Sequence, residues 1–140
     1  MWKRFFIYGF LGLLAEVLWN GFGAMFKGDI LLRGTTCIWM LPIYGLAVFL
    51  EPVHYRIKHL PFIVRGGIYM ILIFAVELAS GLLLRSILGV CPWNYVNDKM
   101  SVCGIITLNY APVWFACGIM FEKIHDAILR IENNANDYAK

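Results

Sequence analysis

Long apolar stretches separated by short charged connectors make up most of the chain. A helix rises about 1.5 Å per residue, so about 20 apolar residues are needed to cross a hydrocarbon core about 30 Å thick. The pattern predicts an all-α integral membrane protein with four transmembrane helices, at residues 5–26, 35–50, 61–84 and 102–121. The second stretch is the shortest and needs its flanks to cross. No linker-like tract divides residues 1–122, so one compact membrane domain is expected there.

Composition favours a membrane protein over a soluble one. The 140 residues are 61% hydrophobic and 15% charged, with a mean hydropathy of +0.70, whereas a soluble domain is about one quarter charged. The first apolar stretch is too long for the core of a signal peptide, and Glu16 and Asn20 lie in its middle. It is therefore expected to remain in the protein as a membrane span.

The basic residues of the connectors predict the orientation. With four crossings, both termini and the second connector share one side of the membrane. That side carries Lys3, Arg4, Arg56, Lys58, Arg65, Lys123, Arg130 and Lys140. The opposite side carries Lys27, Arg33, Arg85 and Lys99. The excess on the first side predicts a multi-pass protein with cytoplasmic N- and C-termini.

The end of the chain shows a helical period of its own. Apolar residues recur at spacings of three and four from Phe121 to Ile131, and charged residues fill the opposite face. Residues 123–140 are therefore predicted to form a cytoplasmic amphipathic tail, in which the helix ends near Asn133 and Asn134. Such a helix lies on the bilayer surface or packs against a neighbouring subunit.

Two glutamates fall inside predicted spans. Because a charged group at the centre of a bilayer costs roughly 3 kcal/mol or more, Glu16 and Glu77 are expected to face the protein interior, bind a partner or stay protonated. Glu16 shares one helix face with Gly9, Gly12, Asn20 and Gly23, a stripe on which another helix can approach closely. The residues predicted to line a substrate or ion path are Glu16, Asn20, Tyr44, Glu77 and Asn109.

The two halves of the chain repeat one spaced pattern. It consists of Glu16, Gly34 and Pro42 in the first half and of Glu77, Gly104 and Pro112 in the second, with eight residues from glycine to proline in both. We interpret it as a two-helix unit used twice, which would bring both glutamates to one central site. Each proline is expected near mid-depth of its span, where it would kink the helix.

Other chemistries find little support in the sequence. The four cysteines form no C-x-x-C pair, and the motifs of phosphate-binding loops, serine hydrolases and HExxH zinc enzymes are absent. Cys91 and Cys103 flank one loop, so they either form a disulfide in an oxidising compartment or act as small hydrophobic residues. His54, His59 and His125 are expected to be solvated at the cytoplasmic boundary. No catalytic residue, metal site, cofactor or nucleic-acid partner is predicted.

Three segments resemble elements of a known family. They are "GLLAEVLWNGF", "LLRGTTCIWMLPIYGLAV" and "VELASGLLLRSILGVCPWNYV…CGIITLNYAPVWF". They are similar to the G-x-x-x-E, R-G…P-x-Y-G and E…G…W-D-Y…G elements of the CmpB-type ABC-transporter permease family (ABC-transporter type IV). The nearest variant is the transmembrane protein 229-like branch. The resemblance covers roughly residues 5–122.

The resemblance implies that the loop holding "CPWNY" closes the external mouth of a polar core. The rim would consist of Arg33, Arg85, Trp93, Asn94 and Tyr95. Asn94 stands where the family usually has aspartate, so one charge is missing, but its amide can still bind loop backbone or an arginine. The alternative for Trp93 and Tyr95 is an anchor at the lipid headgroups. The chain has no nucleotide-binding domain, so coupling to ATP would need a separate partner.

These observations favour a small permease-like transport component. Because four short spans enclose little volume, it would act in the bilayer as a homo-oligomer or with a partner membrane protein. A membrane binding or assembly module is the alternative, with the glutamates only fixing helix register. A membrane-embedded enzyme acting on a lipid-like substrate, with Glu16 or Glu77 as general acid or base, is the third function and has the least support.

Overall fold

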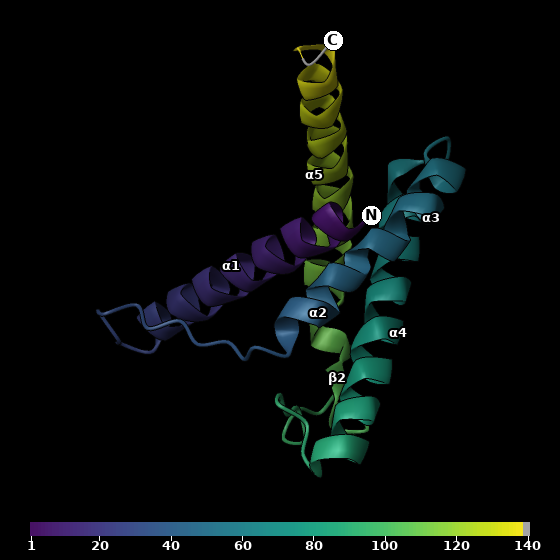
Figure 1. The fold of residues 1–140 in the computed structure, drawn as a ribbon. Helices are drawn as coiled ribbons and strands as arrows, with labels where there is room; N and C mark the ends of the chain where they lie inside the picture. The colour runs from purple at the N-terminus through teal and green to yellow at the C-terminus, as the bar shows by residue number, and fades with distance from the viewer. Residues whose placement is uncertain (139–140) are drawn as a thin grey trace. The chain divides into compact units, whose positions relative to one another are not determined.

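The fold was obtained as a computed structural model, in which residues 1–138 are described (Figure 1). It is mostly helical and contains one short strand pair. The elements are α1 (Trp2–Phe26), α2 (Met40–Gly45), η1 (Leu46–Phe49), α3 (Leu50–Ile57), α4 (Phe62–Leu88), β1 (Ser101–Val102), β2 (Ile106–Thr107), η2 (Leu108–Tyr110) and α5 (Ala111–Tyr138), where η marks a 3-10 helix. Lys140, counted in the charge balance, lies outside the described residues.

The chain divides into two compact units, Met1–Leu50 and Glu51–Lys140. In each unit one long apolar helix packs against the helical segment that follows it: α1 against α2 and η1, and α4 against α5. Because each unit is built from segments that follow one another in the sequence, the chain forms two units without a polar linker between them.

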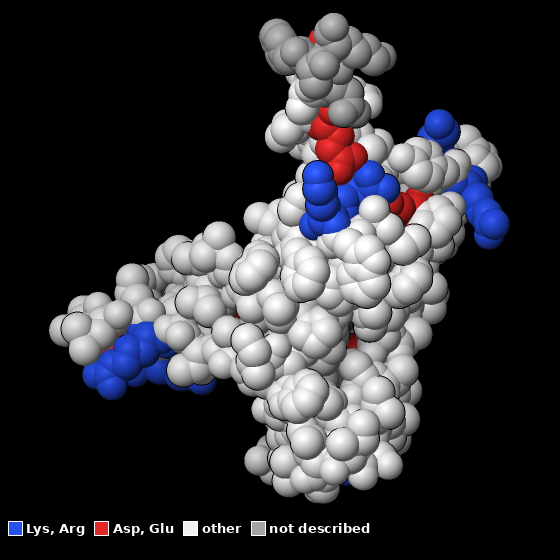
Figure 2. Space-filling model, in the orientation of Figure 1, with Lys and Arg blue, Asp and Glu red and all other residues white. Residues whose placement is uncertain are grey.

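Of the described helices, α1 and α4 are long and apolar enough to cross a membrane. Only 17% of the most apolar window of each is buried within the protein, unlike the core helix of a soluble domain. Exposed apolar side chains along both helices require a nonpolar surrounding. Figure 2 shows charged side chains around α3, whereas the surface along α4 below it is almost free of charge on the face drawn.

The second and fourth predicted spans start later than expected. Residues 34–39 form no regular helix before α2 begins at Met40, and η1 interrupts the helical path before α3. In the fourth span, residues 102–110 form a hairpin and a 3-10 turn before α5 begins at Ala111. The α5 helix then continues to Tyr138 without a break, past the end predicted near Asn133.

The prolines explain these starts, and the predicted mid-helix kinks are wrong. Pro42 and Pro112 each lie in the first turn, of α2 and α5 respectively. Backbone N–H groups of the first turn have no partner within the helix, so a proline there loses no hydrogen bond, and its fixed φ suits the helical conformation.

The glycine stripe of α1 makes close contact along part of its length. A Cβ atom added at Gly12 would collide with the side chain of Tyr44, and one at Gly9 would lie 2.7 Å from the carbonyl oxygen of Leu41. At Gly23 an added Cβ would meet nothing within 4 Å. Small residues thus allow α2 to approach the first half of α1.

The connection from α4 to α5 is built around β1 and β2, which pair antiparallel with Ser101 opposite Thr107. The turn between them places Cys103 and Gly104 at φ values of 57° and 69°. This left-handed conformation is easy for glycine and strained for cysteine. The next three residues, 105–107, are buried, so the hairpin is fixed to its unit by its second strand.

Candidate functional site

Glu16 is bound by two donors from the segment that follows α1. Its Oε2 atom accepts hydrogen bonds from the Thr36 hydroxyl at 2.7 Å and from the Tyr44 hydroxyl at 2.9 Å. Thr36 lies in the irregular segment before α2, and Tyr44 lies in α2. The sequence prediction that Glu16 needs a partner within the protein therefore agrees with this geometry, and both partners are neutral.

Asn20 holds the same irregular segment one turn further along α1. Its Nδ2 atom donates to the carbonyl oxygen of Thr35 at 2.6 Å. A Cβ atom at Gly34 would collide with the carbonyl of Val17, so backbone and helix are in direct contact there. Glycine at position 34 is needed for this approach. The Thr35 carbonyl lies outside any helix, and the side-chain amide of Asn20 supplies a hydrogen-bond donor to it.

Glu77 occupies the corresponding place on α4. Its Oε2 atom accepts a hydrogen bond from the indole N–H of Trp114 at 3.1 Å, and the Tyr95 side chain also hydrogen-bonds to this carboxylate. Ser80, three residues further along α4, donates to the carbonyl of Val76 in its own helix at 2.7 Å. The carboxylate is thus held by two aromatic donors, one from α5 and one from the loop after α4.

The two carboxylates have matched surroundings. Tyr44 lies two residues after Pro42, and Trp114 lies two residues after Pro112. Each is the aromatic donor to the glutamate of its own unit. The repeat found in the sequence aligned only the glutamate, the glycine and the proline. The aromatic residue two positions after each proline is a fourth matching position that the sequence also contains.

The two units also share a contact between a phenylalanine ring and a glycine. In the first unit the Phe5 ring packs on Gly45, and in the second the Phe115 ring packs on Gly66. Phe5 and Gly66 both lie 11 residues before their glutamate, and Gly45 and Phe115 both lie three residues after their proline. One contact is therefore made twice, with the large and the small residue exchanged.

The loop around "CPWNY" is held to the turn between the two strands of the hairpin. The Trp93 indole donates to the carbonyl of Ile105 at 3.0 Å, and the backbone N–H of Tyr95 donates to that of Gly104 at 2.9 Å. The Asn94 side-chain oxygen accepts from the backbone N–H of Val96 at 2.8 Å. Asn94 thus bonds to loop backbone, one of the options left by the missing aspartate.

Each predicted rim arginine binds a group other than the glutamate of its own unit. Arg33 forms an ion pair with Asp29 at 3.6 Å, and its side chain is 71% exposed. Arg85 donates to the backbone carbonyl of Cys103 at 3.2 Å. The four cysteines of the described chain are free thiols.

Asp98, which the sequence did not single out, organises the loop between α4 and α5. Its carboxylate accepts from the backbone N–H of Met100 at 3.1 Å, from the Thr107 hydroxyl at 2.8 Å and from the Asn109 amide at 2.8 and 3.0 Å. These donors, first of all Met100, lower the pKa of Asp98. Asn109, predicted on the transport path, lies here in η2, beside an open cavity of about 670 Å³ lined also by Asn94, Asn97 and Lys99.

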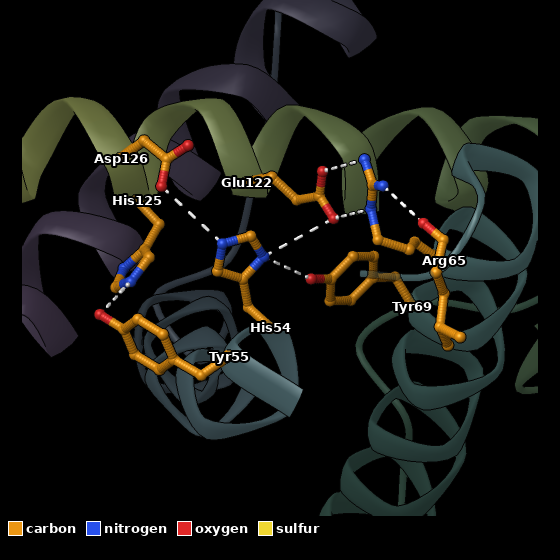
Figure 3. A network of polar contacts seen from close by, with 8 residues as sticks. His54, Tyr55, Arg65, Tyr69, Glu122, His125 and Asp126 are labelled. Carbon is orange, nitrogen blue, oxygen red and sulfur yellow. Dashed lines mark hydrogen bonds and ion pairs between the residues drawn. The ribbon is translucent and has the colours of Figure 1, made fainter. Parts of the chain in front are cut away.

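A third polar cluster joins α3, α4 and α5 (Figure 3). His54 and His125 were expected to be solvated, but they are only 8% and 0% exposed. The Nδ1 atom of His54 lies 3.0 Å from the Tyr69 hydroxyl, and Nε2 of His125 lies 3.1 Å from that of Tyr55. The expectation failed because both histidines face other helices, and only His59 is exposed. No group of three or more His, Cys, Asp and Glu residues within the described chain could hold a metal ion.

Arg65 and Glu122 form the ion pair at the centre of this cluster. Nε of Arg65 lies 2.8 Å from Oε1 of Glu122, and its NH2 nitrogen donates to Oε2 at 3.0 Å. Burial would raise the pKa of Glu122, but the hydrogen bonds and the positive charge of Arg65 outweigh it and lower that pKa overall. One signal for this cluster was present in the sequence, since Glu122, His125 and Asp126 follow the apolar Phe121 at helical spacing.

A comparison with solved structures finds no match. A comparison with family models finds one family, described as "Putative ABC-transporter type IV", over residues 3–139. This match confirms the resemblance seen in the sequence, and the transmembrane protein 229-like branch stays a prediction. Together with the two long apolar helices, the match indicates a membrane protein whose family is described as a transporter type. The chain belongs to the CmpB-type family of ABC-transporter type IV proteins.

Proposed function

We propose that the chain is a permease-like transport component in which Glu16 and Glu77 mark a polar path through the bilayer. The observation that carries this proposal is the matched placement of the two carboxylates. Each lies on a long apolar helix, and each accepts a hydrogen bond from the aromatic residue two positions after a helix-starting proline.

The chemistry of these sites suits transient binding. Both sets of donors are neutral hydroxyl or indole groups, so neither carboxylate is neutralised by a fixed cation in these contacts. A carboxylate has about four acceptor positions and keeps some of them available beside two donors. Such a group can bind a proton or a cationic group of a substrate and release it, which a buried ion pair with arginine does poorly.

The repeat is part of the proposal. Matched carboxylates, aromatic donors, prolines and exchanged Phe–Gly contacts support one helical unit used twice, as in transporters built from internal repeats. In this arrangement the chain has four crossings with cytoplasmic termini, and the Trp93–Tyr95 loop lies at the external mouth. A homo-oligomer or a partner membrane protein supplies the remaining wall of the path.

The transported solute can be found by screening many solute classes at once. Liposomes containing the full-length protein are loaded with mixed amino acids, sugars, nucleosides and inorganic ions, and retention is measured by mass spectrometry. We expect at least one solute class to leave about tenfold faster than from empty liposomes, and Glu16→Gln and Glu77→Gln to reduce that release. Asp137→Asn, an exposed residue near the end of α5, is the control. Release that neither glutamine variant changes would contradict the proposal.

An assembly module is the second candidate, and the bonds of Glu16 favour it. They tie the irregular segment and α2 to α1, so they would serve equally to fix a surface for another membrane protein. Purification in mild detergent separates the two functions. A stoichiometric protein partner that is retained by both glutamine variants, with no solute release, would establish the assembly function.

A further inference from the structure

The His54 side chain lies where three helices meet, and acidic groups face both of its ring nitrogens. From α5, Oε1 of Glu122 lies 3.6 Å from Nδ1, and Oδ1 of Asp126 lies 3.8 Å from Nε2. From α4, the Tyr69 hydroxyl lies 3.0 Å from Nδ1. The ring is 8% exposed, so water screens these contacts weakly.

The charged groups nearest the ring come from α4 and α5. Arg65 of α4 is paired with Glu122 of α5. Asp126, which faces Nε2 of His54, lines a surface pocket with Lys123 and Arg130 of the same helix. On the far side, His125 packs against His54 with ring centroids 5.6 Å apart and lies 3.7 Å from Glu51. The Tyr55 ring, 5.8 Å from that of His54, is the remaining neighbour on α3. A protonated His54 would therefore have a carboxylate facing each ring nitrogen.

Tyr69 makes the contact sensitive to this proton. Its hydroxyl has one hydrogen to donate, and Nδ1 of a neutral His54 can accept it. The same hydroxyl also hydrogen-bonds to Glu122. When Nδ1 carries a proton it can no longer accept, so Tyr69 donates to Glu122 and His54 donates to the acidic groups beside it.

We propose that His54 is a proton-binding site that latches α3 onto α4 and α5. Few backbone positions of α3 lie close to α4 or α5 within the described chain, so side chains supply much of the attachment. The protonated ring adds charge-assisted bonds to Glu122 and Asp126, and these are lost as the pH rises and the ring becomes neutral. The latch is therefore tight in mildly acidic conditions and loose in alkaline ones. It does not depend on the transport function proposed above.

Hydrogen–deuterium exchange of the full chain in lipid nanodiscs tests this proposal. Exchange of residues 50–57 is measured from pH 5.5 to 8, corrected for intrinsic rates and referred to residues in the middle of α4. We expect protection of α3 to fall about threefold to tenfold across this range in a single step. His54→Gln should remove the step. His59→Gln, which changes the exposed histidine just beyond α3, should retain it.

A second variant keeps the test decisive if His54→Gln fails to fold. The Asp126 side chain is 51% exposed, so Asp126→Asn should be tolerated. This change removes one of the two carboxylates that face the protonated ring, so we expect the step in protection to become smaller. Three outcomes would overturn the latch: no step in the wild type, a step that persists in His54→Gln, or a step of unchanged size in Asp126→Asn.

Discussion

At the scale of single residues, several charged side chains of this protein bind partners that lie far away in sequence. Glu16 is bound by Tyr44, and Arg65 is paired with Glu122 across 57 positions of the chain. In an apolar surrounding, an unpartnered carboxylate or guanidinium is costly, so each of these groups must find its partner during folding. Removing one partner of such a pair should cost more than removing both.

The Arg65–Glu122 pair gives the clearest case. Glu122→Gln leaves the guanidinium without a countercharge in a site where the glutamate side chain is only 6% exposed. We expect the thermal unfolding midpoint in detergent to fall by roughly 5 °C or more, and the double variant Arg65→Met with Glu122→Met to recover much of this loss. Asp137→Asn, which changes an exposed carboxylate further along α5, is the control. A double variant no more stable than Glu122→Gln would contradict this account.

Asp98 gives a prediction for pH. Its pKa is lowered in the folded loop, so its charged form stabilises the fold above the pKa of an unfolded aspartate, about 3.9, and this contribution is lost as the pH falls through the folded pKa. At pH 7, Asp98→Asn should therefore increase hydrogen exchange in residues 101–107 severalfold. The difference between variant and wild type should disappear near pH 3, and a difference that persists there would point to a cause other than charge.

The sequence predicted part of these residue contacts. The cost of burying a carboxylate was enough to predict that Glu16 has a partner, because that argument needs no knowledge of the fold. The positions of His54 and His125 were missed because a boundary residue faces either water or another helix, and only the packing of α3, α4 and α5 decides between them. Asp98 was missed for a related reason, since its donors Thr107 and Asn109 reach it only through the hairpin.

At the scale of helices, the length of an apolar run predicted the two long helices well, whereas the predicted starts of the other two spans were wrong. The α1 and α4 helices agree with their predicted ranges to within a few residues. Each is a long apolar run without an internal proline, so nothing in the sequence interrupts the helix. The stretches with Pro42 and Pro112 start late because each proline marks the first turn of a helix. A proline inside an apolar run was interpreted as a kink, although proline is most easily accommodated at a helix start.

The exchanged Phe–Gly contacts lead to a prediction about helix packing. Gly66→Phe alone should clash with Phe115, and Phe115→Gly alone should leave a cavity. The double variant reproduces the arrangement that Phe5 and Gly45 already have in the first unit, so we expect it to be more stable than either single variant. A double-mutant cycle on thermal stability should give a favourable coupling of about 1–3 kcal/mol. Additive losses would mean that the two contacts are not equivalent.

At the scale of the whole molecule, the number of membrane crossings decides on which side of the membrane the loop between α4 and α5 lies. If only α1 and α4 cross, the loop from residue 89 to 101 and the end of α5 lie on one side of the membrane. If α2–η1 and the first half of α5 also cross, they lie on opposite sides. The four apolar stretches predict four crossings. Because the basic residues near both termini outnumber those near the loop, the termini are then expected on the cytoplasmic side.

Cysteine labelling distinguishes these two topologies. Cys103 is exposed in the hairpin turn, and Asp137→Cys adds a thiol near the end of α5, where residue 137 is also exposed. We expect a membrane-impermeant maleimide to label Cys103 in intact cells and to label position 137 only after the cells are lysed. The other three native cysteines are replaced by alanine, and Cys103→Ala serves as the control for background labelling. Labelling of both positions only after lysis would place the loop beside the C-terminus, and α5 would then not cross the membrane. The Trp93–Tyr95 loop would lose its role as an external mouth, while the two carboxylate sites would keep their partners within each unit.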